Sequence, residues 1–129
     1  MRCLIVEDDQ LVAERWRQVL GDLGMETTLA YSQAEGERSL NSERFGLMLA
    51  DLGLPDGDGL DLIALAATRD PSLPVVVVSG RTNLALSDLF SRNDNVTAFF
   101  HKSENFEEVA ALVDHYRLRS ASPGAAPLA

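Results

Sequence analysis

The chain has 129 residues, of which 46% are hydrophobic and 24% are charged, and its formal net charge is −9. This length and composition are those of one globular domain with its own core, so a fibrous or disordered chain is excluded. The negative charge repels phosphate backbones, and we expect no direct binding of nucleic acid.

The N-terminal residues and the cysteine content indicate the cellular compartment in which the protein is expected. No apolar run approaches the roughly 20 residues of a membrane span, and the chain passes directly into a strand-like segment instead of a signal peptide. The single cysteine, Cys3, permits no internal disulfide. A reducing compartment is therefore favoured. We expect a cytoplasmic protein that does not contact a membrane.

The first third of the chain predicts two strands and two helices. Cys3–Val6 is a continuous apolar run, typical of a strand. Apolar residues at helical spacing then predict a helix over Leu11–Leu23, and Gly24 provides a helix stop. A weaker strand follows over Thr27–Ala30, and then a polar helix over Ser32–Asn41 that the Ser32 hydroxyl can cap.

The middle of the chain predicts two buried strands. Leu47–Ala50 is one of them, and turn residues over Leu54–Gly59 separate it from a helix marked by the apolar residues of Leu60–Ala67. Val75–Val78 is a run of four valines without alternation. Such a run suits a parallel strand that is covered on both faces, so we place it inside the sheet.

The last part of the chain completes five alternations of strand and helix. A helix over Asn83–Phe90, a strand over Val96–His101 and a helix over Asn105–Leu118 are predicted. The whole pattern indicates an α/β fold with a five-stranded parallel sheet. We expect one domain over residues 1–118 and a flexible tail or the start of a linker over 119–129.

Polar residues follow four of the predicted strands. Glu7 and Asp8 follow the first strand, Asp51 the third, Ser79 the fourth and Lys102 the fifth. Ligands of an open parallel sheet bind at the carboxyl ends of its strands, so these residues should gather at one edge. Carboxylates from two neighbouring strand ends offer the hard oxygen ligands that Mg²⁺ prefers.

This constellation resembles the receiver domains of two-component response regulators, over about residues 2–118. In that family an acidic pair ends the first strand, a phosphoacceptor aspartate ends the third, a Ser or Thr ends the fourth and a lysine ends the fifth. The run Asp51–Gly59 is similar to the phosphorylation loop of the family. The resemblance implies a flavodoxin-like, doubly wound (βα)5 sheet with strand order 2-1-3-4-5.

The resemblance also implies a role for each acidic position. Asp51 would be the nucleophile that takes a phosphoryl group from a sensor histidine kinase or a phosphotransfer protein. Mg²⁺ would be held by Glu7, Asp8, Asp51 and the backbone carbonyl of Gly53. The domain would then be a phosphoacceptor switch that assists its own phosphorylation and dephosphorylation, not an enzyme acting on a separate substrate.

The switch itself is implied by three further positions. Ser79 and Lys102 would contact two phosphoryl oxygens. Movement of Ser79 toward the phosphate would let an aromatic residue of the fifth strand, by position Phe99, turn inward. An output surface would thereby change for a downstream effector domain or protein.

Taken alone, these residues have simpler interpretations: Asp51 could be a turn residue before Gly and Pro, and Ser79 with Gly80 could be a turn that ends a strand. Asp9 is interpreted as a helix cap and is left out of the site. An exposed lysine is usually a solvated charge, but the chain has ten arginines and one lysine, Lys102, placed where the chemistry needs it.

Two other functions are alternatives to a phosphorylated receiver. A nucleotide-binding enzyme is disfavoured because acids, and not a glycine-rich loop, follow the first strand. A receiver-like interaction module that is not phosphorylated is the stronger alternative, because Ser103 follows Lys102 where most receivers have a proline.

Overall fold

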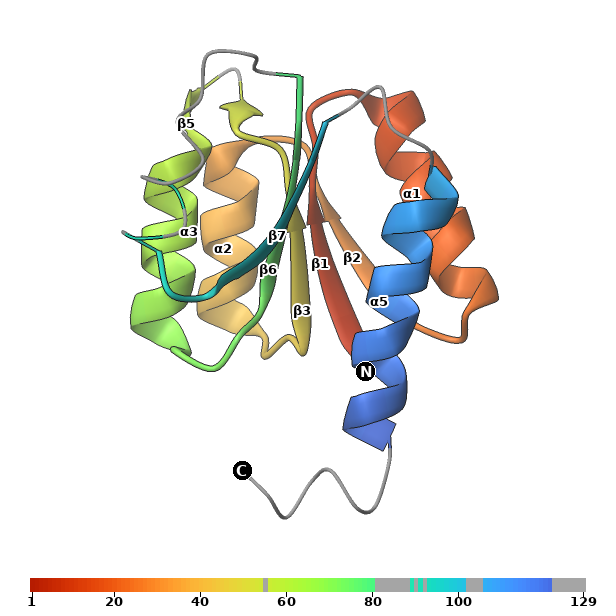
Figure 1. Ribbon diagram of the computed structural model, residues 1–129. Helices are drawn as coiled ribbons and strands as arrows, with labels where there is room; N and C mark the ends of the chain where they lie inside the picture. Colours follow the sequence, from red (N-terminus) through yellow and green to blue (C-terminus); the bar gives the residue numbers. More distant parts are fainter. Residues whose placement is uncertain (55, 81–88, 90, 92, 102–105, 122–129) are drawn as a thin grey trace.

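The computed structural model describes residues 1–54, 56–80, 89, 91, 93–101 and 106–121 (Figure 1). Strands and helices alternate along the chain. In order, the elements are β1 (Arg2–Val6), α1 (Gln10–Asp22), β2 (Glu26–Ala30), α2 (Gln33–Ser42), β3 (Leu47–Ala50), β4 (Gly53–Leu54), β5 (Gly57–Asp58), α3 (Gly59–Arg69), β6 (Val75–Ser79), β7 (Val96–His101) and α5 (Phe106–Ala121).

Five of the strands form one parallel sheet in the order β2-β1-β3-β6-β7. Strands β4 and β5 belong to a separate hairpin, so β6 and β7 are the fourth and fifth strands of this sheet. The order is therefore the predicted 2-1-3-4-5, and the predicted fold class is confirmed. The pairing of β1 with β3 places Cys3 opposite Leu47 and Val6 opposite Ala50. The carboxyl ends of these two central strands therefore lie level with each other.

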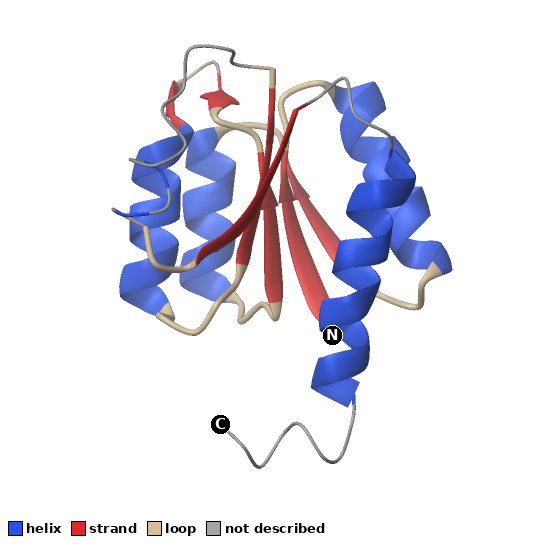
Figure 2. Ribbon diagram, viewed as in Figure 1, coloured by secondary structure: helices blue, strands red, loops and turns tan. Residues whose placement is uncertain are grey.

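Helices cover both faces of the sheet (Figure 2). Helices α2 and α3 lie on one face, and α1 and α5 lie on the other. Successive residues of a strand point to opposite faces, which divides the core into two apolar clusters. Leu4, Val6, Met48 and Ala50 belong to one cluster, and Cys3, Ile5, Leu47 and Leu49 belong to the other.

The run of four valines occupies an interior strand, as predicted. Strand β6 pairs with β3 on one side and with β7 on the other. Val75, Val76, Val77 and Val78 are all buried. Trp16 on α1 is also buried, in the cluster between the sheet, α1 and α5.

Side-chain caps fix where two helices begin. The Asp9 carboxylate accepts hydrogen bonds from the backbone N–H groups of Leu11 and Val12, at 3.0 and 3.2 Å, and so caps α1. The Ser32 hydroxyl accepts one from the Glu35 N–H at 3.2 Å and caps α2. Both caps agree with the sequence prediction. After α1, Gly24 adopts φ 86°, the left-handed region that glycine reaches without strain.

The structure differs from the prediction in three places. The turn predicted over Leu54–Gly59 contains a short antiparallel hairpin, in which β4 pairs with β5. Helix α3 begins at Gly59 and continues to Arg69, and α5 runs to Ala121 instead of ending at Leu118. The predicted helix over Asn83–Phe90 falls almost wholly outside the described residues, so it stays a prediction.

Gly59 is where α3 packs against the segment that follows β3. A Cβ atom at this position would lie 2.7 Å from the carbonyl oxygen of Asp51 and 2.7 Å from the Cα of Leu52. Both are backbone atoms, so neither can move aside as a flexible side chain would. The absence of a side chain at Gly59 therefore lets α3 start directly against the backbone of Asp51.

We predict that Gly59→Ala destabilises the fold by about 1–3 kcal/mol, because the methyl group forces a backbone shift next to Asp51. Urea unfolding measures this change. Gly21→Ala is the matched control, since a methyl group there meets nothing within 4 Å and lies within a helix. The control should gain up to about 1 kcal/mol. A Gly59→Ala protein as stable as the parent would contradict this packing.

Candidate functional site

Three carboxylates converge at the carboxyl ends of β1 and β3. Glu7 and Asp8 come directly after β1, and Asp51 comes directly after β3. One carboxylate oxygen of each residue lies within 4.8 Å of the others. Glu7 and Asp51 are only 3% and 6% exposed, whereas Asp8 is exposed. The convergence expected from the sequence is present, and we call Glu7, Asp8 and Asp51 the acidic cluster.

Backbone hydrogen bonds hold the acidic cluster in place. The Asp51 N–H donates to the Val6 carbonyl at 2.9 Å, and the Glu7 N–H donates to the Ala30 carbonyl at 2.9 Å. The ladders of the sheet thus continue into the first residue after each strand. The positions of these two acids are consequently set by the strands themselves.

Gly53 lies beside the phosphoacceptor candidate. Its backbone N–H donates a hydrogen bond to Oδ1 of Asp51 at 3.1 Å. This bond closes a tight turn after β3 and orients the Asp51 carboxylate. Metal ligation by the Gly53 carbonyl stays a prediction.

The space beneath the acidic cluster is small and largely apolar. Glu7 and Asp51 line a cavity of about 10 Å³ together with the side chain of Trp16 and neighbouring strand residues. This volume is at the lower limit for one water molecule. A ligand therefore has to reach the carboxylates from the outer edge of the sheet, where Asp8 is exposed.

The electrostatics of the acidic cluster favour a divalent cation. Carboxylates at this separation repel each other when ionised, and burial of two of them adds a desolvation cost. A bound cation offsets both effects. The donor set consists of carboxylate oxygens with an open outer side, which fits Mg²⁺ because this ion takes oxygen ligands and keeps several waters.

Two of the three residues assigned to the switch, Ser79 and Phe99, lie on the neighbouring strands β6 and β7. Ser79 is the last residue of β6, so it lies at the same edge of the sheet as Asp51. Its exposed fraction is only 1%. Phe99 lies opposite Val77 in the β6–β7 pair and is partly buried against the cluster that contains Leu62. Lys102 and Ser103 lie outside the described residues, so their roles stay predictions from the sequence.

Asp56 is a residue of this region that the sequence analysis missed. Its carboxylate accepts hydrogen bonds from the backbone N–H of Gln33 at 2.8 Å and from that of Ala34 at 3.0 Å. These bonds, that of Gln33 first, hold the pKa of Asp56 below its ordinary value. The loop after Asp51 is thereby tied to the start of α2. The sequence indicates a turn around Asp56, but it does not indicate that Gln33 and Ala34 are its hydrogen-bond partners.

The family profile of the response regulator receiver domain matches residues 3–114 of the chain. The chain belongs to this family. It is 36% identical over 118 residues to the virulence transcriptional regulatory protein PhoP of Salmonella typhimurium, and 34% identical over 116 residues to the transcriptional regulatory protein PhoP of Escherichia coli O157:H7. Each alignment covers 88% of this chain and 52% of the relative, so the chain spans about half the length of these relatives.

Solved structures agree with the family assignment. A CheY-like response regulator receiver domain from Methanospirillum hungatei JF-1 is 30% identical, with a TM-score of 0.77, and the alignment covers 90% of this chain and 95% of that one. The response regulator TrrA of Thermotoga maritima, in complex with Mg²⁺-BeF, has a TM-score of 0.78 at 23% identity, covering 89% and 97% of the two chains. At that identity the second likeness concerns the fold alone.

The chain is thus a receiver domain of the two-component response regulator family, a family of phosphoacceptor switches. The acidic cluster is consistent with the phosphorylation site of such a domain. Among the described helices, none is both long and apolar enough to cross a membrane.

We predict that Asp8→Asn and Asp51→Asn leave the fold intact and, without metal, are as stable as the parent or more stable by up to about 1–2 kcal/mol. Each change removes one of three mutually repelling charges. Urea unfolding with EDTA measures the effect. Asp94→Asn, an exposed acid outside the acidic cluster, is the control and should change stability little. If both cluster variants were clearly less stable than the parent, mutual repulsion would not dominate at this site.

Proposed function

We propose that Asp51 accepts a phosphoryl group from a sensor histidine kinase or a phosphotransfer protein, in a reaction that requires Mg²⁺. We further propose that the phosphorylated domain alters an output surface and thereby acts within a phosphorelay. The observation that carries this proposal is the approach of one oxygen from each of Glu7, Asp8 and Asp51 to within 4.8 Å.

The chemistry assigned to Asp51 is nucleophilic attack by a carboxylate oxygen on phosphorus. A new O–P bond forms an acyl phosphate, while the bond from phosphorus to the donor nitrogen breaks and its electron pair stays with the donor. The Gly53 N–H holds Oδ1 of Asp51, which fixes the orientation of the whole carboxylate. Bound Mg²⁺ would neutralise negative charge on the carboxylates and on the transferred group.

Asp8 and Glu7 have different environments, and we assign them different tasks. Asp8 is exposed and is the better placed to ligate a hydrated cation directly. Glu7 is buried at the end of β1, where its charge adds to the attraction for a cation and where contact through a bound water suffices. The small, largely apolar space beneath the cluster leaves room for at most about one water molecule on the inner side of Asp51.

We assign the switch to Ser79, Lys102 and Phe99. The Ser79 hydroxyl would hydrogen-bond one phosphoryl oxygen, and Lys102 would pair with another. Phe99 would turn further inward against the core, since a phenyl ring lacks a hydroxyl group and gains from packing alone. The recipient of this change would be a downstream effector domain or protein. The named relatives are transcriptional regulators, and the aligned residues make up 52% of their length.

A second candidate function is an interaction module that is not phosphorylated. Ser103 favours this alternative, because most receivers have a proline after the lysine. The acidic cluster opposes it, because an interaction module has no need of two nearly buried acids beside a third.

Incubation with acetyl phosphate distinguishes the two functions. We predict that intact-mass spectrometry detects one phosphoryl group per chain in the presence of Mg²⁺, with loss of the adduct on treatment with hydroxylamine. The adduct should be absent with EDTA and in Asp51→Asn. Asp61→Asn, an exposed acid at the start of α3, should be labelled like the parent.

Two results would refute phosphorylation at Asp51. One is an adduct that persists in Asp51→Asn, which would place the phosphoryl group elsewhere. The other is the absence of any adduct in a folded parent protein saturated with Mg²⁺, which would favour the interaction module.

A further inference from the structure

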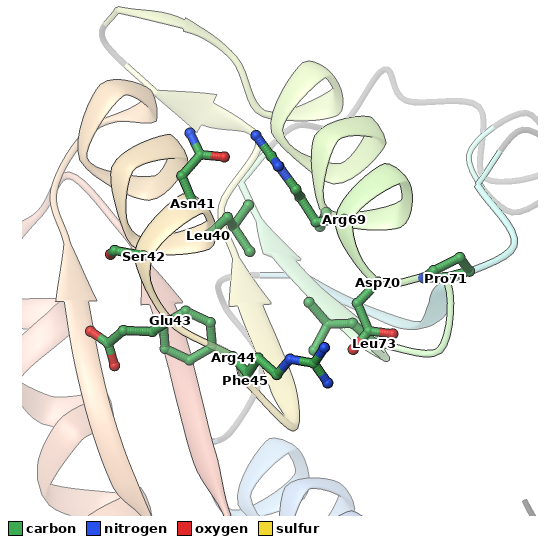
Figure 3. Close-up of a pocket in the computed structure, with 11 residues that line it drawn as sticks. Leu40, Asn41, Ser42, Glu43, Arg44, Phe45, Arg69, Asp70, Pro71 and Leu73 are labelled. Carbon is green, nitrogen blue, oxygen red and sulfur yellow. The ribbon is translucent and has the colours of Figure 1, made fainter.

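A second pocket lies at the opposite end of the sheet from the acidic cluster. The connection from α2 to β3 forms one side of it, and the end of α3 with the turn that follows forms the other (Figure 3). Its volume is about 360 Å³. This value falls within the roughly 300–1,000 Å³ that small-molecule sites usually occupy. We call it the α2–α3 pocket.

The inner lining of the α2–α3 pocket is apolar. Leu40 and Phe45 contribute from the α2 side, and Ala66 and Leu73 contribute from the α3 side. All four are at most 8% exposed, and they belong to the core cluster on this face of the sheet. The base of the pocket is therefore a rigid, preformed surface suited to a hydrocarbon group.

The rim of the α2–α3 pocket carries two arginines, Arg44 and Arg69, both exposed. In Figure 3 the Arg69 side chain extends toward the side of the pocket that carries Asn41, and the Arg44 guanidinium points toward the side of Asp70 and Leu73. Within the described part of the chain, neither arginine forms an ion pair or a side-chain hydrogen bond. Each guanidinium thus has all its donors available to a ligand.

The two acids of the lining are already engaged. Glu43 pairs with Arg2 at 3.1 Å, and its carboxylate points away from Arg44 in Figure 3. The Asp70 carboxylate accepts hydrogen bonds from the backbone N–H of Ser72 at 3.0 Å and from its hydroxyl at 2.6 Å. The hydrogen bonds from Ser72 leave the charge of Asp70 in place, but with Glu43 paired to Arg2 the two arginines of the rim outnumber this one remaining acid.

We propose that the α2–α3 pocket binds a small organic carboxylate with a hydrocarbon body. The body would pack on Leu40 and Phe45. The exposed side chains of Arg44 and Arg69 extend to different sides of the pocket in Figure 3, and both would turn inward to give the carboxylate charge-assisted hydrogen bonds. A guanidinium matches a carboxylate with two parallel hydrogen bonds, which gives this chemistry its selectivity over a neutral ligand. The site is independent of Asp51, because it lies at the other end of the strands.

The test is an NMR titration of ¹⁵N-labelled protein with 4-phenylbutyrate, compared with its neutral amide, 4-phenylbutyramide. Saturable shifts should concentrate on pocket residues such as Asn41, Arg44 and Leu73, while Gly53 beside the acidic cluster stays unchanged. The amide should bind about tenfold more weakly, the loss expected for a charge-assisted hydrogen bond.

Single variants test the arginines. Arg44→Gln and Arg69→Gln should each weaken binding of 4-phenylbutyrate by about tenfold. Arg38→Gln is the matched control, because Arg38 is an exposed arginine of α2 that does not line the pocket. The control should bind like the parent.

Three outcomes would overturn the proposal. They are the absence of saturable shifts up to millimolar probe, equal affinity for the amide and the carboxylate, and equal affinity of the Arg44→Gln, Arg69→Gln and Arg38→Gln proteins. None of them bears on phosphorylation, since Asp51 takes no part in the titration.

Discussion

The parallel pairing of β1 with β3 is the constraint on which the site depends. Its register sets Val6 opposite Ala50. The residues that follow these two, Glu7 and Asp51, are therefore at the same level of the sheet. Neighbouring strands lie about 4.7–4.9 Å apart, which brings the side chains of Glu7 and Asp51 close without any further device. A shift of one residue in this register would turn one of the two side chains toward the opposite face.

This arrangement buries carboxylate charges, which is unfavourable for the stability of the fold. Two carboxylates are nearly buried at the strand ends, above an apolar floor that includes Trp16. The loop after Asp51 is held closely as well. Gly53 bonds the Asp51 carboxylate, Gly59 brings α3 against its backbone, and Asp56 ties the loop to α2. These contacts keep the acids of the cluster together despite their mutual repulsion, in positions where they can bind a cation.

The sequence predicted the features that depend on local pattern. Apolar runs such as Val75–Val78 indicate the strands, and the placement of acids after two of them indicates the acidic cluster. The β4–β5 hairpin was not predicted, because two-residue strands leave no periodicity to read. The bonds from Asp56 to Gln33 and Ala34 and the α2–α3 pocket were not predicted either. Both arise from contacts between segments more than 20 residues apart, which no local pattern records.

The central claim is that the acidic cluster is a cation site, and the dependence of stability on Mg²⁺ tests it most directly. The decisive measurement is the free energy of unfolding across a Mg²⁺ titration for the parent, Asp8→Asn and Asp9→Asn. Asp8 and Asp9 are adjacent in the sequence, so Asp9→Asn removes the same charge from nearly the same place. Asp9 caps α1, and asparagine caps a helix equally well. The account predicts that stability rises with Mg²⁺ in the parent and in Asp9→Asn, as binding to the folded state requires, and that the rise is lost or strongly reduced in Asp8→Asn. A parent protein indifferent to Mg²⁺, or an Asp8→Asn protein that gains as much as the parent, would contradict it.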